Sequence, residues 1–243
     1  MPAGAQPFVF NHAAGVTRTL IGHGQIAITR IDNALQDPAG AAAIGRAQSY
    51  AKDPSNFYPG LRASMPESFS TAFRAWLTPI LQSLEVLKPD QVLYRDESFF
   101  SVVTTAGTDL LPIQRIPHYD STDPKLLAAV IYLCDPKSAA TTFGGTSFYR
   151  HRRTGYEEIT AKNHANYQLA LDHDMHLHGP PKREYTDGNS LLFESLFSVP
   201  LQFNTAVIYP GRVLHAANIH RQFTPPRDPG EWRLTITAVL QST

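Results

Sequence analysis

The sequence contains a single cysteine, Cys134, among its 243 residues. An intrachain disulfide is therefore impossible, and this sparing use of cysteine is typical of proteins from a reducing compartment. The chain also has no excess of charge of either sign, because 21 basic residues balance 21 acidic ones. This balance argues against electrostatic capture of nucleic acid or of an anionic membrane surface.

Long apolar runs are missing as well. No stretch approaches the roughly 20 residues that a membrane-spanning helix needs, and residues 1–15 show no basic segment followed by an apolar one, as a secretory signal would. We therefore expect a cytoplasmic protein without a membrane partner. Because 42% of the residues are hydrophobic, the chain can form one large core, and we expect a single domain over residues 1–243.

The predicted elements begin with helices and end with short strands. Residues 1–24 give little periodic signal, and the alternating stretch 25–32 predicts a first strand. Helices are predicted over 38–50 and over 66–87, with a loop between them and a kink or break in the second helix at Pro79. Further strands are predicted over residues 96–105, 110–120, 126–133, 143–150, 204–215 and 232–240.

This order of elements predicts a mainly β fold with supporting helices, a double-stranded β-helix or jelly-roll. We expect the core at about 92–150 and 204–241, and the helical support at 33–88. The segment 154–200 interrupts the rhythm of strands, and a stretch of this length between two core strands is often a lid or a binding insert.

The inserted segment is rich in histidine. On a helix, His173 and His176 would share a face, and with Asp172 and Asp174 they offer ligands for a divalent ion. A solvated loop or helix end is the more common explanation for such a pattern, and contact with a substrate is a third. The role of the histidines in 164–178 stays open at this stage.

A candidate metal site is carried by His118 and Asp120, the only His-x-Asp pair in the sequence. Residues two apart on an extended strand point to the same side, so the imidazole and the carboxylate would face one point. His215, at the end of an apolar run, is the best candidate for a third ligand. Two histidines and one carboxylate leave open positions on the ion, as in non-haem Fe(II) oxygenases. The alternatives are a chance triplet and a core histidine bound to backbone.

A candidate anion site begins at Arg233, which opens an otherwise apolar strand. A buried arginine is costly unless it meets an anion. Arg233 and Thr235 lie on the same face of the predicted strand and would grip a carboxylate together. The alternative is an arginine at a strand end that reaches solvent, and Arg221 in the loop 220–230 is a rival anion partner.

Taken in order, these motifs resemble the Fe(II)/2-oxoglutarate-dependent oxygenases, in particular the prolyl-hydroxylase-like branch. The surroundings of Pro59–Arg62 and Tyr149–His151 resemble the bacterial DUF6445 family within that superfamily. The wider resemblance covers most of residues 25–240 and rests on Ile28–Leu35, His118-Tyr119-Asp120, Tyr132-Leu133-Cys134-Asp135, Gly144-Gly145, Val207–His215 and Arg233-x-Thr235.

The resemblance implies Fe(II) bound by His118, Asp120 and His215. It further implies 2-oxoglutarate as co-substrate, with Arg233, Thr235 and Tyr132 in its binding site, and O2 as the oxidant. The implied reaction is hydroxylation of an unactivated C–H bond in an amino-acid, peptide or small-metabolite substrate. Asp120 argues against halogenation, since halogenating relatives lack that carboxylate.

Two other functions are compatible with the same residues. One is a non-catalytic binding module that holds a metal or ligand, and the other is a cupin-type dioxygenase that needs no 2-oxoglutarate. The identity of the substrate and the oligomeric state, including a homodimer, are left open by the sequence.

Overall fold

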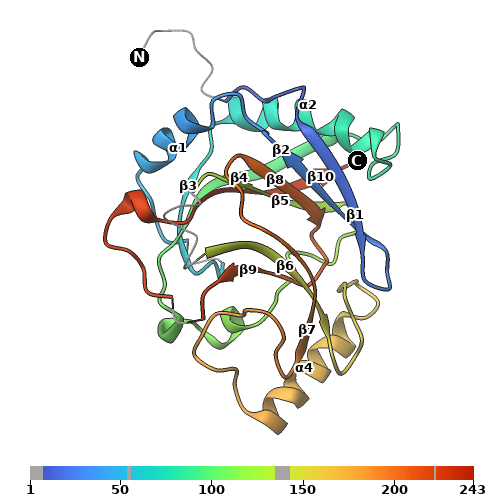
Figure 1. Ribbon diagram of the computed structural model, residues 1–243. Coiled ribbons are helices and arrows are strands. Elements are labelled where there is room, and N and C mark those ends of the chain that lie inside the picture. Colours follow the sequence, from blue (N-terminus) through green and yellow to red (C-terminus); the bar gives the residue numbers. More distant parts are fainter. Residues whose placement is uncertain (1–7, 54–55, 135–142, 222) are drawn as a thin grey trace.

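Two antiparallel sheets form the centre of the molecule, shown as a computed structural model in Figure 1. The structure describes residues 8–53, 56–134, 143–221 and 223–243. The larger sheet has the strand order β1-β2-β8-β5-β10-β4-β3 and the smaller has the order β7-β6-β9. The bounds are β1 (Gly15–Ile21), β2 (Ile26–Asp32), β3 (Gly60–Ser64), β4 (Leu93–Val103), β5 (Leu126–Tyr132), β6 (Phe143–His151), β7 (Phe193–Val199), β8 (Thr205–Pro210), β9 (His215–Ile219) and β10 (Leu234–Ser242).

From β4 onward the chain passes back and forth between the two sheets. β4, β5, β8 and β10 lie in the larger sheet, whereas β6, β7 and β9 lie in the smaller one. Between β4 and β5, His118 pairs with His215 of β9 in a single bridge at the open edge of the smaller sheet. This alternation is that of a jelly-roll, so the predicted fold class is confirmed.

Helices α1 (Pro38–Arg46) and α2 (Glu67–Ser83) cover the outer face of the larger sheet (Figure 1). The buried side chains of α2, Phe69, Phe73, Trp76 and Leu77, recur at helical spacing and pack against the sheet. Along β10, alternate residues such as Leu234 and Ile236 point into this core. The residues between them therefore face the smaller sheet, and this pleat determines which side of β10 carries the functional site.

Three predicted helix features differ in the structure. The first helix ends at Arg46 instead of residue 50, and the second ends at Ser83 instead of residue 87. Of the kink or break predicted at Pro79, the break is wrong, because α2 continues through this residue. A proline removes only one helical hydrogen bond, and buried residues on both sides of it, Leu77 and Leu81, hold the helix against the sheet.

Several strand predictions are corrected as well. The expected loop 53–66 contains β3, which pairs with β4. The stretch 1–24, for which no strand was predicted, contains β1. The expected strand 204–215 is two strands, because the chain turns after Pro210 and crosses to the other sheet at His215. The expected strand 110–120 has the short helix η2 (Pro112–Arg115) and only the single bridge at His118.

The segment 154–200 supplies a core strand in addition to an inserted helix. Its strand β7 pairs with β6 of the smaller sheet, and its helix α4 (His164–His178) lies at the far end of the molecule from α1 and α2 (Figure 1). Among the described residues, no helix is long and apolar enough to span a membrane.

Helix α4 is attached to the sheet through a buried polar cluster. His151 at the end of β6 is fully buried, and its Nε2 lies 3.0 Å from the carboxylate of Asp174 on α4. Arg153 donates from Nε to the other oxygen of Asp174 at 2.6 Å. Burial lowers the pKa of His151, while hydrogen bonding to Asp174 opposes this shift. The cluster therefore links α4 to the jelly-roll by charge-assisted hydrogen bonds.

We expect Asp174→Ala to destabilise the protein by about 2–3 kcal/mol, because it leaves the buried His151 ring nitrogen and Arg153 without their acceptor. Chemical denaturation of the variant and the parent protein gives the difference in the free energy of unfolding. Asp172→Ala is the matched control, since Asp172 is exposed on the same helix. Equal losses in both variants would show that the cluster does not anchor α4.

Candidate metal centre

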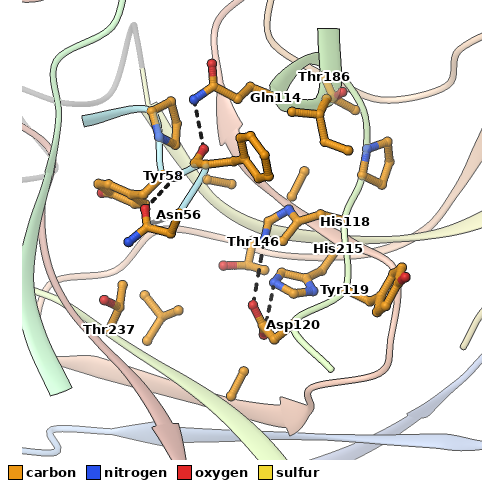
Figure 2. A pocket seen from close by; sticks show the side chains of 18 of the residues that line it. Asn56, Tyr58, Gln114, His118, Tyr119, Asp120, Thr146, Thr186, His215 and Thr237 are labelled. Atoms are coloured by element: carbon orange, nitrogen blue, oxygen red, sulfur yellow. Dashed lines mark hydrogen bonds and ion pairs between the residues drawn. The ribbon is translucent and has the colours of Figure 1, made fainter. Parts of the chain in front are cut away.

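His118, Asp120 and His215 converge in the structure although the histidines are far apart in the sequence. The backbone N–H of His118 donates to the carbonyl of His215 at 2.9 Å, and the N–H of His215 donates back to His118 at 2.8 Å. The two rings consequently lie side by side, with centroids 4.3 Å apart. The backbone N–H of Asp120 donates to the carbonyl of Gly211 at 2.7 Å. The carboxylate of Asp120 is directed toward both rings (Figure 2).

The three ligand atoms are arranged as a metal site requires. The Oδ1 atom of Asp120 lies 3.9 Å from Nε2 of His118, and Oδ2 lies 3.7 Å from Nε2 of His215. All three donor atoms lie within 4.8 Å of one another, and no other described residues form such a group of His, Cys, Asp or Glu. Adjacent donors bound at about 2.1 Å lie about 3 Å apart, so closure around one ion needs shifts of only about an ångström.

The hydrogen bonding of His215 suits a ligand. Its Nδ1 donates to the carbonyl of Val213 at 2.9 Å, which leaves the lone pair of Nε2 directed at the shared point. The ring of Tyr209 packs against His215 with centroids 4.7 Å apart. His215 is buried, so its backbone bond and this packing fix the orientation of the ring. His215 is therefore buried and bonded to backbone, as the alternative proposed, but only through Nδ1. Its Nε2 remains directed at Asp120.

His118 is neutral under ordinary conditions. Its side chain opens into a cavity and is 53% exposed, but it is surrounded by protein atoms. Desolvation, His215 and the positive charge of Arg62 lower the pKa of His118 to about 4, against the opposing effect of Asp120. A neutral imidazole has a free lone pair, so protons do not compete with a metal ion near pH 7.

The three residues face a cavity of about 660 Å³ between the sheets. Its walls also include Tyr58 and Arg62 on one side, and Tyr167 and Leu171 of α4 on another. Figure 2 shows Tyr58 and Thr237 around the space into which His118 and Asp120 point. The volume is sufficient for a co-substrate and a small substrate together.

Of the residues predicted to bind the co-substrate, Arg233 lines this cavity. It is buried, and its guanidinium group donates to the carbonyl of Gly145 at 3.0 Å. No carboxylate of the described residues lies within ion-pair distance of it. Because an unpaired buried guanidinium is costly, this position suits an anionic ligand. The alternative of an arginine that reaches solvent is wrong.

Tyr132 and Thr235 are close to Arg233 but lie behind the cavity wall. The hydroxyl of Tyr132 is 2.7 Å from that of Thr146, and its ring lies 5.7 Å from the guanidinium carbon of Arg233. Thr235 donates to the carbonyl of Ser101 at 3.3 Å. Neither residue lines the cavity, and the rival Arg221 does not line it either. The structure thus places the ring of Tyr132 against Arg233, and Thr235 is the cross-strand neighbour of Tyr132 on β10.

The sequence reasoning missed Tyr58 and Arg62, which lie in and beside the unexpected strand β3. Both line the cavity, and both have a buried polar atom without a hydrogen-bond partner among the described residues. The only available signal was the family likeness around Pro59–Arg62. The suggested second metal site is not formed: His173, His176 and His178 are exposed on α4 and do not belong to any ligand group in the described part of the chain.

A family model described as "Family of unknown function (DUF6445)" matches residues 12–240. This match confirms the predicted likeness to DUF6445. No curated protein shows a significant match to the chain.

Several solved structures are similar at low identity. The epimerase SnoN, solved in complex with Fe3+, alpha ketoglutarate and nogalamycin RO, is 14% identical, with 90% of this chain and 80% of that chain covered and a TM-score of 0.48. A Pseudomonas putida prolyl-4-hydroxylase is 12% identical, with coverage of 90% and 94% and a TM-score of 0.44. HygX from Streptomyces hygroscopicus, solved with nickel and 2-oxoglutarate, is 14% identical, with coverage of 89% and 83% and a TM-score of 0.44. These likenesses are too distant to assign a reaction to this chain.

Proposed function

The chain belongs to the DUF6445 family, and we propose that this protein is an Fe(II)- and 2-oxoglutarate-dependent dioxygenase. The proposed reaction is hydroxylation of an unactivated C–H bond in an amino-acid, peptide or small-metabolite substrate. The observation that carries the proposal is the convergence of His118, Asp120 and His215 in a cavity that also contains the unpaired Arg233.

The donor set fits Fe(II). Two imidazoles and one carboxylate on one side of an ion are the ligands of non-haem Fe(II) oxygenases. His118 and Asp120 come from the same short segment and His215 comes from β9, so all three approach from the smaller sheet. These residues line the cavity, so an ion that they held would leave room there for a co-substrate, O2 and a substrate.

Besides the metal site, Arg233 would bind the proposed co-substrate through its carboxylate. A guanidinium fork pairs well with a carboxylate, and burial strengthens the pairing. Tyr132, through its ring, and Thr235, from the same face of β10, would act as positioning residues that keep the guanidinium group in place. Desolvation raises the pKa of Tyr132 to about 12, so it stays neutral and does not compete with the anionic ligand.

When bound together, Fe(II), 2-oxoglutarate and O2 supply the oxidising chemistry that C–H hydroxylation requires. The chain's own residues would hold the metal ion, orient the co-substrate and enclose the substrate. Tyr119, Tyr167 and Leu171 form an apolar wall of the cavity and limit the access of water to the reacting groups. We propose that two parts of the segment 154–200 meet the substrate, because both line the cavity: α4, through Gln168 and Leu171, and the stretch at Tyr185 and Thr186.

Anaerobic addition of Fe(II) and 2-oxoglutarate should produce a visible charge-transfer band at one equivalent of each per chain, because both ligands bind in one cavity. Admission of O2 should then yield succinate. Fe(II) binding without the band and without succinate would instead support a binding module. Consumption of O2 that is independent of 2-oxoglutarate would support a cupin-type dioxygenase.

A further inference from the structure

A second arginine, Arg62 of β3, lines the same cavity as the metal-site residues. No carboxylate of the described residues forms an ion pair with it. Its Nε is buried and has no hydrogen-bond partner among the described residues, and the same holds for the hydroxyl of the adjacent Tyr58. Two of the three such side-chain atoms in the described residues therefore lie together at this wall.

The guanidinium group of Arg62 is held in place by two aromatic rings. Its central carbon lies 4.5 Å from the ring centre of Tyr58 and 5.1 Å from that of Phe99. These cation–π contacts fix the group but satisfy none of its hydrogen-bond donors. Arg62 is half-buried, and its buried Nε lacks a partner among the described residues. An anionic ligand would supply an acceptor for this fixed guanidinium group and offset the cost of its desolvation.

Arg62 and Arg233 lie at different positions around the cavity. In the larger sheet, Arg62 pairs with Ser101 of β4, and Ser101 pairs with Thr235 of β10. Neighbouring strands are about 4.8 Å apart, so the backbone of Arg62 lies about 10 Å from that of Thr235. Arg62 lines the same cavity as His118, Asp120 and His215, so its charge faces the space that these residues share. A co-substrate carboxylate bound at Arg233 would therefore not pair with Arg62, and Arg62 would still lack an anionic partner.

We propose that Arg62 determines substrate specificity by binding a carboxylate of the primary substrate, which makes the substrate class a carboxylic acid. This inference rests on the proposed function. Phe57, Ile113 and Ile116 line the cavity together with Arg62, so the acid carries a partly apolar body. Glu97 also lines the cavity but pairs with Arg95 at 3.0 Å, and its side chain is 62% exposed. The net charge at this wall therefore favours an anion.

The test compares phenylacetate with phenylacetamide, which differ in charge but hardly in size. Protein loaded with Zn(II) and N-oxalylglycine, an unreactive analogue of 2-oxoglutarate, is titrated by ligand-observed NMR. We expect phenylacetate to bind at least about tenfold more tightly than the amide, and Arg62→Gln to remove this preference, because the charge-assisted hydrogen bonds are lost. Arg62→Lys should retain part of it, since it keeps the charge but not the fork. Arg18→Gln, at an exposed arginine of β1, should leave it unchanged.

A second measurement distinguishes the substrate site from the co-substrate site. The dissociation constant of 2-oxoglutarate, measured through the anaerobic Fe(II) band, should change by less than about threefold in Arg62→Gln. A rise of about tenfold or more would place Arg62 in the co-substrate site and overturn the inference. The same conclusion would follow from equal binding of acid and amide by the parent protein, or from a preference that survives Arg62→Gln. Failure of the proposed function would give a different result, because the parent protein would then not bind 2-oxoglutarate at all. In that case, the NMR titration without the analogue still measures whether Arg62 binds the carboxylate of phenylacetate.

Discussion

Replacement of His118 by alanine should abolish succinate formation. The substitution reduces the proposed metal ligands from three to two, and loss of an outer-shell partner alone typically costs 10–100-fold in metal affinity. We therefore expect the affinity for Fe(II) to fall by more than about a hundredfold and turnover to fall below detection. Anaerobic metal titration and an assay for succinate measure the two effects.

His173→Ala is the control for this experiment, because His173 is an exposed histidine on α4 and should retain full activity. The substitution of His118 should also leave the fold intact, since the side chain is 53% exposed to the cavity and the bridge to His215 uses only backbone atoms. A thermal unfolding curve checks this point. Unchanged turnover in His118→Ala would end the oxygenase assignment.

Replacement of Arg233 by glutamine should separate co-substrate binding from metal binding. Loss of one partner of a buried, hydrogen-bonded charge pair typically costs 2–5 kcal/mol, so the dissociation constant of 2-oxoglutarate should rise by about 30-fold or more. The affinity for Fe(II) alone should not change, because Arg233 is not in the group of metal ligands. Titration of the visible band with 2-oxoglutarate measures the first quantity and anaerobic metal titration the second.

The matched control is Arg221→Gln, because Arg221 lies outside the cavity and pairs loosely with Glu184 and Asp187 at 3.9 and 4.0 Å. This variant should bind 2-oxoglutarate like the parent protein. Full activity in Arg233→Gln, with metal still required, would instead favour a dioxygenase that does not use 2-oxoglutarate.

Short-range periodicity was sufficient to predict part of the site. The two-residue repeat of extended backbone predicted that His118 and Asp120 face one point. Their side chains do converge, although only His118 forms a bridge and Asp120 lies in a bend. His215 was predicted from its place after an apolar run, and it begins β9. The mainly β fold was predictable for the same reason, since most of its strands are apolar stretches bounded by turns.

The remaining features depend on long-range packing, which a single sequence does not reveal. The run 204–215 is apolar on both sides of the turn after Pro210, so periodicity does not show that the chain changes sheets there. β3 is short and lies among prolines, and it becomes a strand by pairing with β4. Because Arg62 lay in an expected loop, the sequence did not indicate that its side chain lines the cavity. The hydroxyl of Tyr132 was predicted to face a ligand, but its partner Thr146 comes from the other sheet.

The reciprocal backbone bonds between His118 and His215 have a consequence for handling the protein. Zinc fingers and similar small domains acquire their shape only when the ion arrives. Here the two imidazoles are brought together by strand pairing, so we expect their approach not to depend on an ion. Chelation should therefore strip the protein without unfolding it, and different divalent ions should be exchangeable in the same folded sample by dialysis.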